Sequence, residues 1–218
     1  MSLTVAYNPY SVISVYQTMH LPTLLAQPDP VAIARQLIGV ELISTVGDEE
    51  TAVRLTEVEA YFAPDDLASH ARNNTRTKRT EVFWAAPGSC YVYTMHTHMM
   101  LNVVTGPEGT PHAILFRAGE PSRGLETIKA RRNMTKIKRQ LTTGPGVLAK
   151  ALGITDKSLY GSNLLHPDNI LRLEMPDQPV PTEEVIAAKR IGLGVKAGEW
   201  AERPWRFYRK DSVFVTPG

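Results

Sequence analysis

The sequence predicts an α+β fold, in which one compact domain holds a curved, mainly antiparallel β-sheet with helices around it. Three observations support this prediction. The chain has 218 residues, of which 43% are hydrophobic, and this suits one domain with a core of ordinary size. Runs rich in β-branched residues alternate with Gly, Pro and Asp turns between residues 40 and 118. Helical patterns are short and lie before and after these runs.

Residues 1–27 are expected to form an N-terminal arm, extended or poorly ordered, ahead of a domain that covers residues 28–218. The arm lacks the charged start of a secretory signal, and it contains no long apolar run. Neither a signal peptide nor a membrane span is therefore predicted.

The first helix is predicted over residues 28–39, PDPVAIARQLIG. Asp29 can cap its first turn, Pro30 suits its first position, and Gly39 can end it. Next, VELIST and TAVRLTEVEAYF are predicted to pair as a hairpin around the turn VGDEE. In the second of these strands, the alternation of side chains places four residues on one face, namely Leu55, Glu57, Glu59 and Tyr61.

Two further β-rich runs, residues 89–104 and 112–118, follow a Pro-Gly turn and are separated by the turn TGPEGTP. Their side chains also alternate between two faces. This alternation permits three side chains to converge on Glu59: Tyr93, Asn102 and Arg117.

A Thr-Gly-Pro-Gly loop leads into the helical pattern of residues 141–154, LTTGPGVLAKALGI. Such a layout can leave backbone N–H groups free to bind an anion, although Gly-Pro-Gly before a helix commonly marks only a turn. Residues 166–184 are expected to form a loop-rich surface segment. Residues 189–215 return to a strand-like pattern, with aromatic residues that would complete the core.

The formal charge of +2 is too small to indicate a nucleic-acid partner, but the charges are unevenly distributed. Residues 71–80 and 129–139 hold ten of the 24 Lys and Arg residues and no acidic residue. One basic run is typical of a solvated surface. Two runs that flank a polar cluster favour a surface that binds phosphate.

The residue content excludes several kinds of site. Cys90 is the only cysteine, which rules out an intrachain disulfide and a cysteine-based zinc site. His96 and His98 are two residues apart, but no other ligand type lies at matching spacing, so no metal site is predicted. The sequence also lacks a Gly-Lys-Ser/Thr phosphate loop and a G-x-S-x-G nucleophile elbow.

Glu59, beside aromatic side chains, is the strongest candidate for chemistry. A carboxylate at the end of a strand is commonly a surface charge or an ion-pair partner. Next to tyrosine rings, a carboxylate can instead activate water beside a flat surface that holds a ring. Hydrolysis of a glycosidic bond requires this combination.

Five motifs follow one another along the chain: VEAYFAPDDLASHA, PGSCYVYTMHTHMMLNVVT, ILFRAGEP, LTTGPGVLAKALGI and AGEWAERPWRFY. Their content and order resemble the alkyladenine DNA glycosylase family, the 3-methyladenine glycosylases of the human and Bacillus type. The resemblance runs from about residue 30 to the end of the sequence. It implies an enzyme without metal or cofactor that flips a damaged nucleotide out of duplex DNA and cleaves its N-glycosidic bond with water. Flipping is required because the sugar C1′ is shielded inside a duplex.

The resemblance also implies roles for single residues. Glu59 in VEAY resembles the general base of the family, and Arg117 in ILFRAGEP resembles its polar partner near the catalytic water. Asn102 resembles the residue that excludes the 2-amino group of guanine. The residues that resemble the pocket walls are Tyr61, His70 and Tyr93. Because alkylated purines are cationic, tyrosine faces would attract them by cation–π interaction.

Structural explanations for three of these residues remain open. Tyr93 could be a sheet residue that packs in the core, and His70 could be a loop residue bonded to backbone. Arg117 could be the ion-pair partner of Glu57 or Glu120.

The chain departs from the family pattern at the β-hairpin that, by the resemblance, would enter the minor groove of DNA. Many relatives have Tyr-x-x-Tyr-Gly where this chain reads YVYTMHTHMMLN. Either Met95 or His96 can be placed at the tip, where it would fill the gap left by the flipped base. The residues expected to contact the DNA backbone are Arg76, Lys78, Arg79, Gly144 and Gly146. A lysine common among relatives after TTGPG is replaced here by Val147.

We therefore expect a monofunctional DNA glycosylase, since no lysine lies in the matched pocket motifs to form a Schiff base. The expected partner is double-stranded DNA that contains alkylated or deaminated purines, with no membrane partner. We expect a cytoplasmic monomer, associated with the nucleoid if the source is bacterial. The alternatives are a non-catalytic module that binds lesions or single strands, and a hydrolase of free nucleosides. The binding module would not require Glu59, and the hydrolase of free nucleosides would not require the clustered cations.

Overall fold

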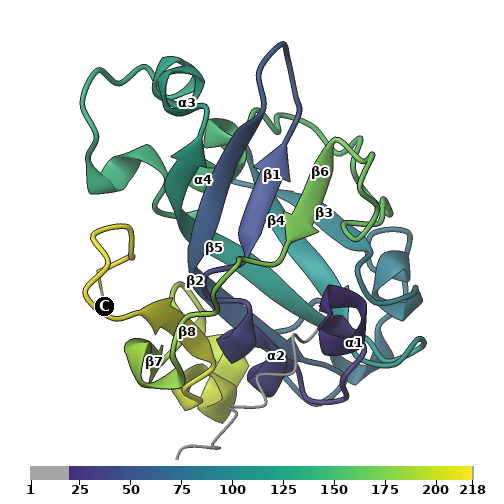
Figure 1. The fold of residues 1–218 in the computed structure, drawn as a ribbon. Helices are drawn as coiled ribbons and strands as arrows, with labels where there is room; N and C mark the ends of the chain where they lie inside the picture. Colours follow the sequence, from purple (N-terminus) through teal and green to yellow (C-terminus); the bar gives the residue numbers. More distant parts are fainter. Residues whose placement is uncertain (1–19, 218) are drawn as a thin grey trace, which may run out of the picture.

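The computed structural model describes residues 20–217 and contains an eight-stranded sheet with helices packed on it (Figure 1). The order of strands is β3-β4-β5-β2-β1-β6, and β8 pairs with both β2 and β7. All of these pairs are antiparallel, so the predicted α+β class with a mainly antiparallel sheet is confirmed. The strands are β1 (Glu41–Ser44), β2 (Thr51–Phe62), β3 (Cys90–Met95), β4 (His98–Thr105), β5 (His112–Arg123), β6 (Leu171–Glu174), β7 (Val185–Ala188) and β8 (Arg206–Arg209).

The helices of the described residues are short. The α-helices are α1 (Leu21–Leu25), α2 (Pro30–Gln36), α3 (Leu125–Arg131) and α4 (Pro145–Ala151). The 3-10 helices are η1 (Arg72–Asn74), η2 (Glu81–Trp84), η3 (Arg139–Leu141), η4 (Thr182–Glu184) and η5 (Val195–Glu202). No helix in this part of the chain is long and apolar enough to span a membrane.

Each face of the sheet carries its own buried cluster. On one face, Ile33 of α2 and Leu148 of α4 pack with Phe116 of β5. On the other face, Leu115 of β5 packs with Phe83 of η2, in the segment that follows β2. Neighbouring residues of β5 thus belong to opposite clusters, as the alternation of a strand requires. The candidate site lies on the second face.

The helix and the hairpin predicted before residue 62 are confirmed. Asp29 caps α2, because its side chain accepts a hydrogen bond from the backbone N–H of Val31 at 2.8 Å. The helix gives way to a left-handed turn at Gly39, where φ is 92°. Strands β1 and β2 pair with Ser44 opposite Thr51, around the predicted turn.

One residue of β2 does not lie on the predicted face. Thr56 of β2 and Arg117 of β5 have no partner in the pairing of these two strands, which shifts register on both sides of Glu57. We call the face of the sheet that carries Glu57 and Glu59 the carboxylate face. Because a β-bulge interrupts the alternation, Leu55 packs on the other face, in the cluster that contains Val58. The prediction is wrong for Leu55.

The expected N-terminal arm needs correction, and the loop-rich segment contains one strand that was not expected. Residues 1–19 of the predicted arm lie outside the described residues, but α1 falls inside it and buries Leu24 and Leu25 in the core. That part of the predicted arm is neither extended nor free of the domain. The segment 166–184, expected to be loop-rich, contains β6, which pairs with β1 at the edge of the sheet. Short strands of this kind depend on their partner more than on their own sequence.

A buried ion pair fastens the segment after β2 to the segment after β7. The side chains of Asp66 and Arg190 have no exposed surface, and Arg190 donates to both carboxylate oxygens of Asp66, at 2.5 and 2.9 Å. Its guanidinium lies 4.7 Å from the ring centre of Tyr61 and 5.2 Å from that of Trp205. This contact places Ile191 beside β2.

We expect Asp66→Asn to lower the free energy of unfolding by about 3–5 kcal/mol, because it leaves the Arg190 charge buried without its partner. Urea denaturation followed by circular dichroism measures the change. Glu81→Gln is the control, since it breaks the exposed ion pair of Glu81 with Arg76 and should leave the midpoint unchanged. Equal midpoints for the two variants would contradict the assigned role of Asp66.

Candidate active site

A cavity of about 260 Å³ lies on the carboxylate face of the sheet. Its walls come from strands β2 to β5, the segment after β2, and the turn after β7. Five side chains predicted for the site line it: Tyr61, His70, Tyr93, Asn102 and Arg117. The structure thus brings Tyr93, Asn102 and Arg117 to one cavity, and of these three Arg117 contacts Glu59. A larger cavity of about 690 Å³ lies near Phe214 and is lined by none of the predicted site residues.

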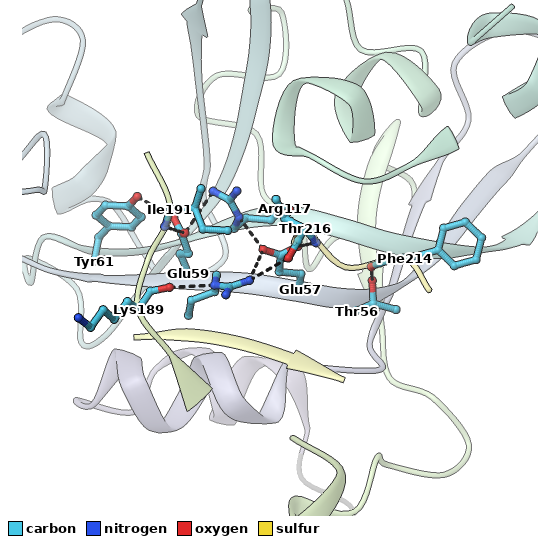
Figure 2. Close-up of polar contacts among 10 residues, drawn as sticks. Thr56, Glu57, Glu59, Tyr61, Arg117, Lys189, Ile191, Phe214 and Thr216 are labelled. Atoms are coloured by element: carbon cyan, nitrogen blue, oxygen red, sulfur yellow. Dashed lines mark hydrogen bonds and ion pairs between the residues drawn. The ribbon is translucent and has the colours of Figure 1, made fainter. Parts of the chain in front are cut away.

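Glu59 does not line this cavity itself, because its side chain has no exposed surface, but three residues that bond to it do: Tyr61, Arg117 and Ile191. Figure 2 shows three donors around its carboxylate. Oε1 accepts from the backbone N–H of Ile191 at 2.7 Å and lies 3.1 Å from Nη1 of Arg117. Oε2 accepts from the hydroxyl of Tyr61 at 2.9 Å. Burial raises the pKa of Glu59, and the three donors oppose this effect.

Tyr61 keeps its proton. Burial, followed by the charge of Glu59, raises the pKa of Tyr61 well above its usual value. The hydroxyl of Tyr61 is therefore the donor and the carboxylate of Glu59 the acceptor in the bond between them.

Arg117 contacts two carboxylates at once. Its Nε donates to Oε1 of Glu57 at 2.9 Å, and its Nη1 lies 3.1 Å from Oε1 of Glu59. The structural explanation that paired Arg117 with Glu57 is thus correct, and it coexists with the predicted contact to Glu59.

Aromatic rings form the opposite wall of the cavity. The rings of Tyr91 and Tyr93 stack with centres 5.2 Å apart, and His70 meets Tyr93 edge-on at 4.7 Å. His70 Nδ1 also lies 2.9 Å from the hydroxyl of Tyr91. The amide of Asn102 donates to the backbone carbonyl of Tyr91 at 3.0 Å, which fixes its position in the wall.

Arg79 packs against the tyrosines of this wall. Its guanidinium lies 5.1 Å from the ring centre of Tyr93, and its Nε donates to the hydroxyl of Tyr91 at 3.2 Å. Burial, followed by the charges of Arg79 and Arg72, lowers the pKa of His70 to about 4. His70 is therefore neutral at neutral pH.

The matched family model is that of methylpurine-DNA glycosylase, and it covers residues 24–213. The chain belongs to the methylpurine-DNA glycosylase family. The predicted class of enzyme, a hydrolase that cleaves N-glycosyl bonds, is thereby confirmed.

Curated relatives agree with the family. A protein of Natranaerobius thermophilus is 39% identical over 192 residues, which cover 87% of this chain and 95% of the relative. A Bacillus cereus protein is 40% identical over 205 residues, covering 91% of this chain and 99% of the relative. A Bacillus licheniformis protein is 38% identical over 196 residues, with 90% and 96% covered. Each is named, as a provisional assignment, a 3-methyladenine DNA glycosylase.

The tip of the β3–β4 hairpin of this glycosylase is formed by His96 and Thr97. Met95 pairs with His98, and the two residues between them have φ of 46° and 69°, the left-handed conformation of a tight two-residue turn. Of the two candidates for the tip, His96 occupies it. Met95 lies one position earlier, is 42% exposed and lines the cavity.

The residues expected to contact the DNA backbone differ in their surroundings. Arg76 pairs with Glu81 at 2.6 Å, and Arg79 lies over the ring of Tyr93. Gly146 packs so closely on the hairpin that an added Cβ would lie 2.5 Å from the Cβ of His98. Gly144 starts α4 with a φ of 100°. Lys78 is exposed and makes no ion pair within residues 20–217.

The cations of the second basic run, residues 129–139, also differ in their partners. Arg131 and Arg132 donate to backbone carbonyls of Ala151 and Leu141, at 3.2 Å in each case. Three cations of this run are exposed and form no ion pair within the described residues: Lys136, Lys138 and Arg139.

Sequence reasoning missed three contributors to the site. Ile191 acts through a backbone N–H, which leaves no signal in the identity of its side chain. Arg190 and Tyr91 are the other two, and only Tyr91 carried a signal, because it alternates with Tyr93 on one strand. No group of three or more His, Cys, Asp or Glu residues within residues 20–217 is placed to hold a metal.

We expect Tyr61→Phe to raise the pKa of Glu59, because a bond to the ionised form lowers the pKa and this substitution removes one such bond. Carbon-13 NMR of labelled glutamate side chains measures the pKa, with Glu59→Gln to assign the signal. Tyr93→Phe is the matched control, since its hydroxyl makes no bond to Glu59. An unchanged titration in Tyr61→Phe would contradict the geometry.

We expect Arg79→Gln to raise the pKa of His70 above its value of about 4, because a neighbouring positive charge opposes protonation. Proton NMR of the imidazole signals measures it. Arg76→Gln removes an equal charge from the same run but lies over Trp84, so the pKa of His70 should stay the same. A shift of the same size in both variants would show that Arg79 has no special contact with His70.

Proposed function

We propose that the chain is a monofunctional DNA glycosylase that excises alkylated or deaminated purines from duplex DNA with a water activated by Glu59. The observation that carries the proposal is a fully buried carboxylate held by three residues that line a cavity with aromatic walls. A buried carboxylate of this kind is costly to the fold, and pure DNA binding gains nothing from it. This favours the enzyme over a non-catalytic binding module.

Glu59 is suited to act as a general base. Burial raises its pKa toward the working pH, which strengthens it as a proton acceptor, while Arg117 favours its ionised form. An ionised carboxylate offers about four acceptor positions. Three donors occupy Glu59, two at Oε1 and one at Oε2, so one position on Oε2 remains for a water.

The proposed reaction conserves its atoms and charge as follows. The water oxygen forms a bond to C1′ of the deoxyribose and gives its proton to Glu59. The N-glycosidic bond breaks, and its electron pair leaves with the base. A cationic alkylated purine leaves as a neutral base, whereas a neutral lesion such as hypoxanthine needs a proton or a hydrogen bond as it departs.

The cavity can select among bases. Tyr61 and Tyr93 present ring faces that attract a cationic purine. Neutral His70 carries no charge that would repel such a base. Asn102, which is held by the carbonyl of Tyr91, is proposed to exclude guanine by collision with its 2-amino group.

Duplex DNA would meet the hairpin first. His96 at its tip is proposed to fill the gap that the flipped base leaves, with Met95 between the gap and the cavity. The exposed cations Lys78, Lys136, Lys138 and Arg139 are the proposed phosphate contacts. Such contacts make the affinity for duplex fall steeply with salt.

Among residues 20–217, no lysine lines the cavity. A Schiff base with the sugar is therefore not expected, and the proposed product is an intact strand with an abasic site. We further propose that the chain works as a monomer.

The test is single-turnover release of hypoxanthine, ethenoadenine and 3-methyladenine from duplex oligonucleotides. We expect Glu59→Gln to lower the release rate by about 10²–10⁴-fold while it retains binding, since it removes the general base. Glu174→Gln, on the exposed edge of the sheet, is the matched control and should release base at the wild-type rate. Tight lesion binding by the wild type without release of any of the three bases would overturn the proposal in favour of a binding module.

A further inference from the structure

A second glutamate lies beside Glu59 and takes no direct part in the proposed chemistry. Glu57 points from the same face of β2, its side chain has no exposed surface, and its carboxylate accepts four hydrogen bonds (Figure 2). Oε1 accepts from Arg117 Nε at 2.9 Å and from Arg206 Nη1 at 3.2 Å. Oε2 accepts from the backbone N–H and the hydroxyl of Thr216, both at 2.7 Å.

The two donors from Thr216 belong to a short segment, residues 214–216, that crosses β2. Thr56 fastens the same segment, because its hydroxyl donates to the carbonyl of Phe214 at 2.5 Å. The family model ends at residue 213, so Thr216 lies beyond the matched range. A segment outside the family match thus supplies two of the four hydrogen-bond donors to Glu57, a buried carboxylate next to the active site.

Glu57 controls the orientation of Arg117. The Nε of Arg117 donates a hydrogen bond to Glu57, and its Nη1 forms an ion pair with Glu59. The two carboxylates together fix the plane of the guanidinium. Without the Glu57 contact, Arg117 would be free to turn both nitrogens toward Glu59, because a guanidinium prefers a bidentate contact with one carboxylate. That contact would cover the acceptor position that a water needs.

We propose that Glu57 and Thr216 are positioning residues of the glycosylase, which hold Arg117 in the orientation that leaves one acceptor position on Oε2 of Glu59 without a protein donor. The inference rests on the proposed function, since it assigns the roles of base and partner to Glu59 and Arg117. Only a carboxylate can hold this arrangement. Both oxygens of Glu57 receive N–H donors, and a glutamine has only one acceptor oxygen.

The pH dependence separates positioning from simple stabilisation. The negative charge of Glu57 raises the pKa of Glu59, so its removal lowers that pKa. Its removal also frees Arg117 to approach Glu59, and the positive charge of Arg117 lowers the same pKa. Both changes lower the pKa of Glu59, so the acidic limb of the rate profile should move to lower pH and the plateau should fall. The charged or titratable groups around the two carboxylates are Tyr61, Tyr93, Arg117, Arg190 and Arg206.

The experiment measures single-turnover release of hypoxanthine from duplex DNA as a function of pH. Glu57→Gln is expected to lower the plateau rate on the order of 10-fold or more, through a displaced Arg117, and to move the acidic limb to lower pH. Thr56→Val is the matched control. It removes a hydroxyl bond to the same segment without touching Glu57, so it should lower the melting temperature and leave the acidic limb in place.

Thr216 provides a milder and independent test. Thr216→Val, which removes one donor to Glu57, is expected to lower the plateau rate, and Thr216→Ser, which retains the hydroxyl, is expected to restore it. In a Glu57→Gln background, Thr216→Val should have no further effect, because the hydroxyl acts through Glu57.

Each outcome decides a different question. Equal losses from Thr216→Val in both backgrounds, or an acidic limb that stays in place in Glu57→Gln, would overturn the positioning role while base release stands. Release that survives in Glu59→Gln would overturn the proposed function itself. Coupled losses with a shifted limb support both.

Discussion

One arginine shared between two buried carboxylates is the constraint on which the site depends. Glu57 and Glu59 project from the same face of β2, and both are removed from water. Two such charges repel each other and are costly to bury alone. Arg117 and Arg206 balance them, so the cluster as a whole is neutral. The bulges at Thr56 and Arg117 accompany this cluster, since they occur where β2 and β5 bring the charged side chains together.

The rest of the site is assembled around this cluster from distant parts of the chain. Strands β3 to β5 supply the aromatic wall, and the turn after β7 supplies the N–H of Ile191. That turn is held by the buried pair of Asp66 and Arg190, whose guanidinium also supports the ring of Tyr61. A substitution at Asp66 is therefore expected to affect Glu59 through both the ring of Tyr61 and the backbone N–H of Ile191. The carboxylate is fixed from three sides by groups that cannot move separately.

The same structure explains why only part of the basic sequence is available to DNA. Cations that look equivalent in the sequence have different partners in the fold. Arg131 and Arg132 bond to backbone carbonyls, Arg76 pairs with an acid, and Arg79 stacks on the wall of the cavity. The exposed lysines Lys78, Lys136 and Lys138 make no ion pair within residues 20–217. Net charge and charge runs thus overestimate the binding surface, because they do not record which cations the fold already uses.

The sequence by itself determined the α+β class, the capped helix at Asp29, and the hairpin that carries Glu59 and Tyr61 on one face. These follow from local propensity and from a period of two, which act over a few residues. Tertiary structure alone decided the face of Leu55, the helix within the predicted arm, and the N–H of Ile191 as a partner of Glu59. It also placed Arg79 over the ring of Tyr93 and Thr216 beside Glu57. Each of these depends on a bulge or on a contact between segments far apart in the chain, and no local pattern of residues encodes such a contact.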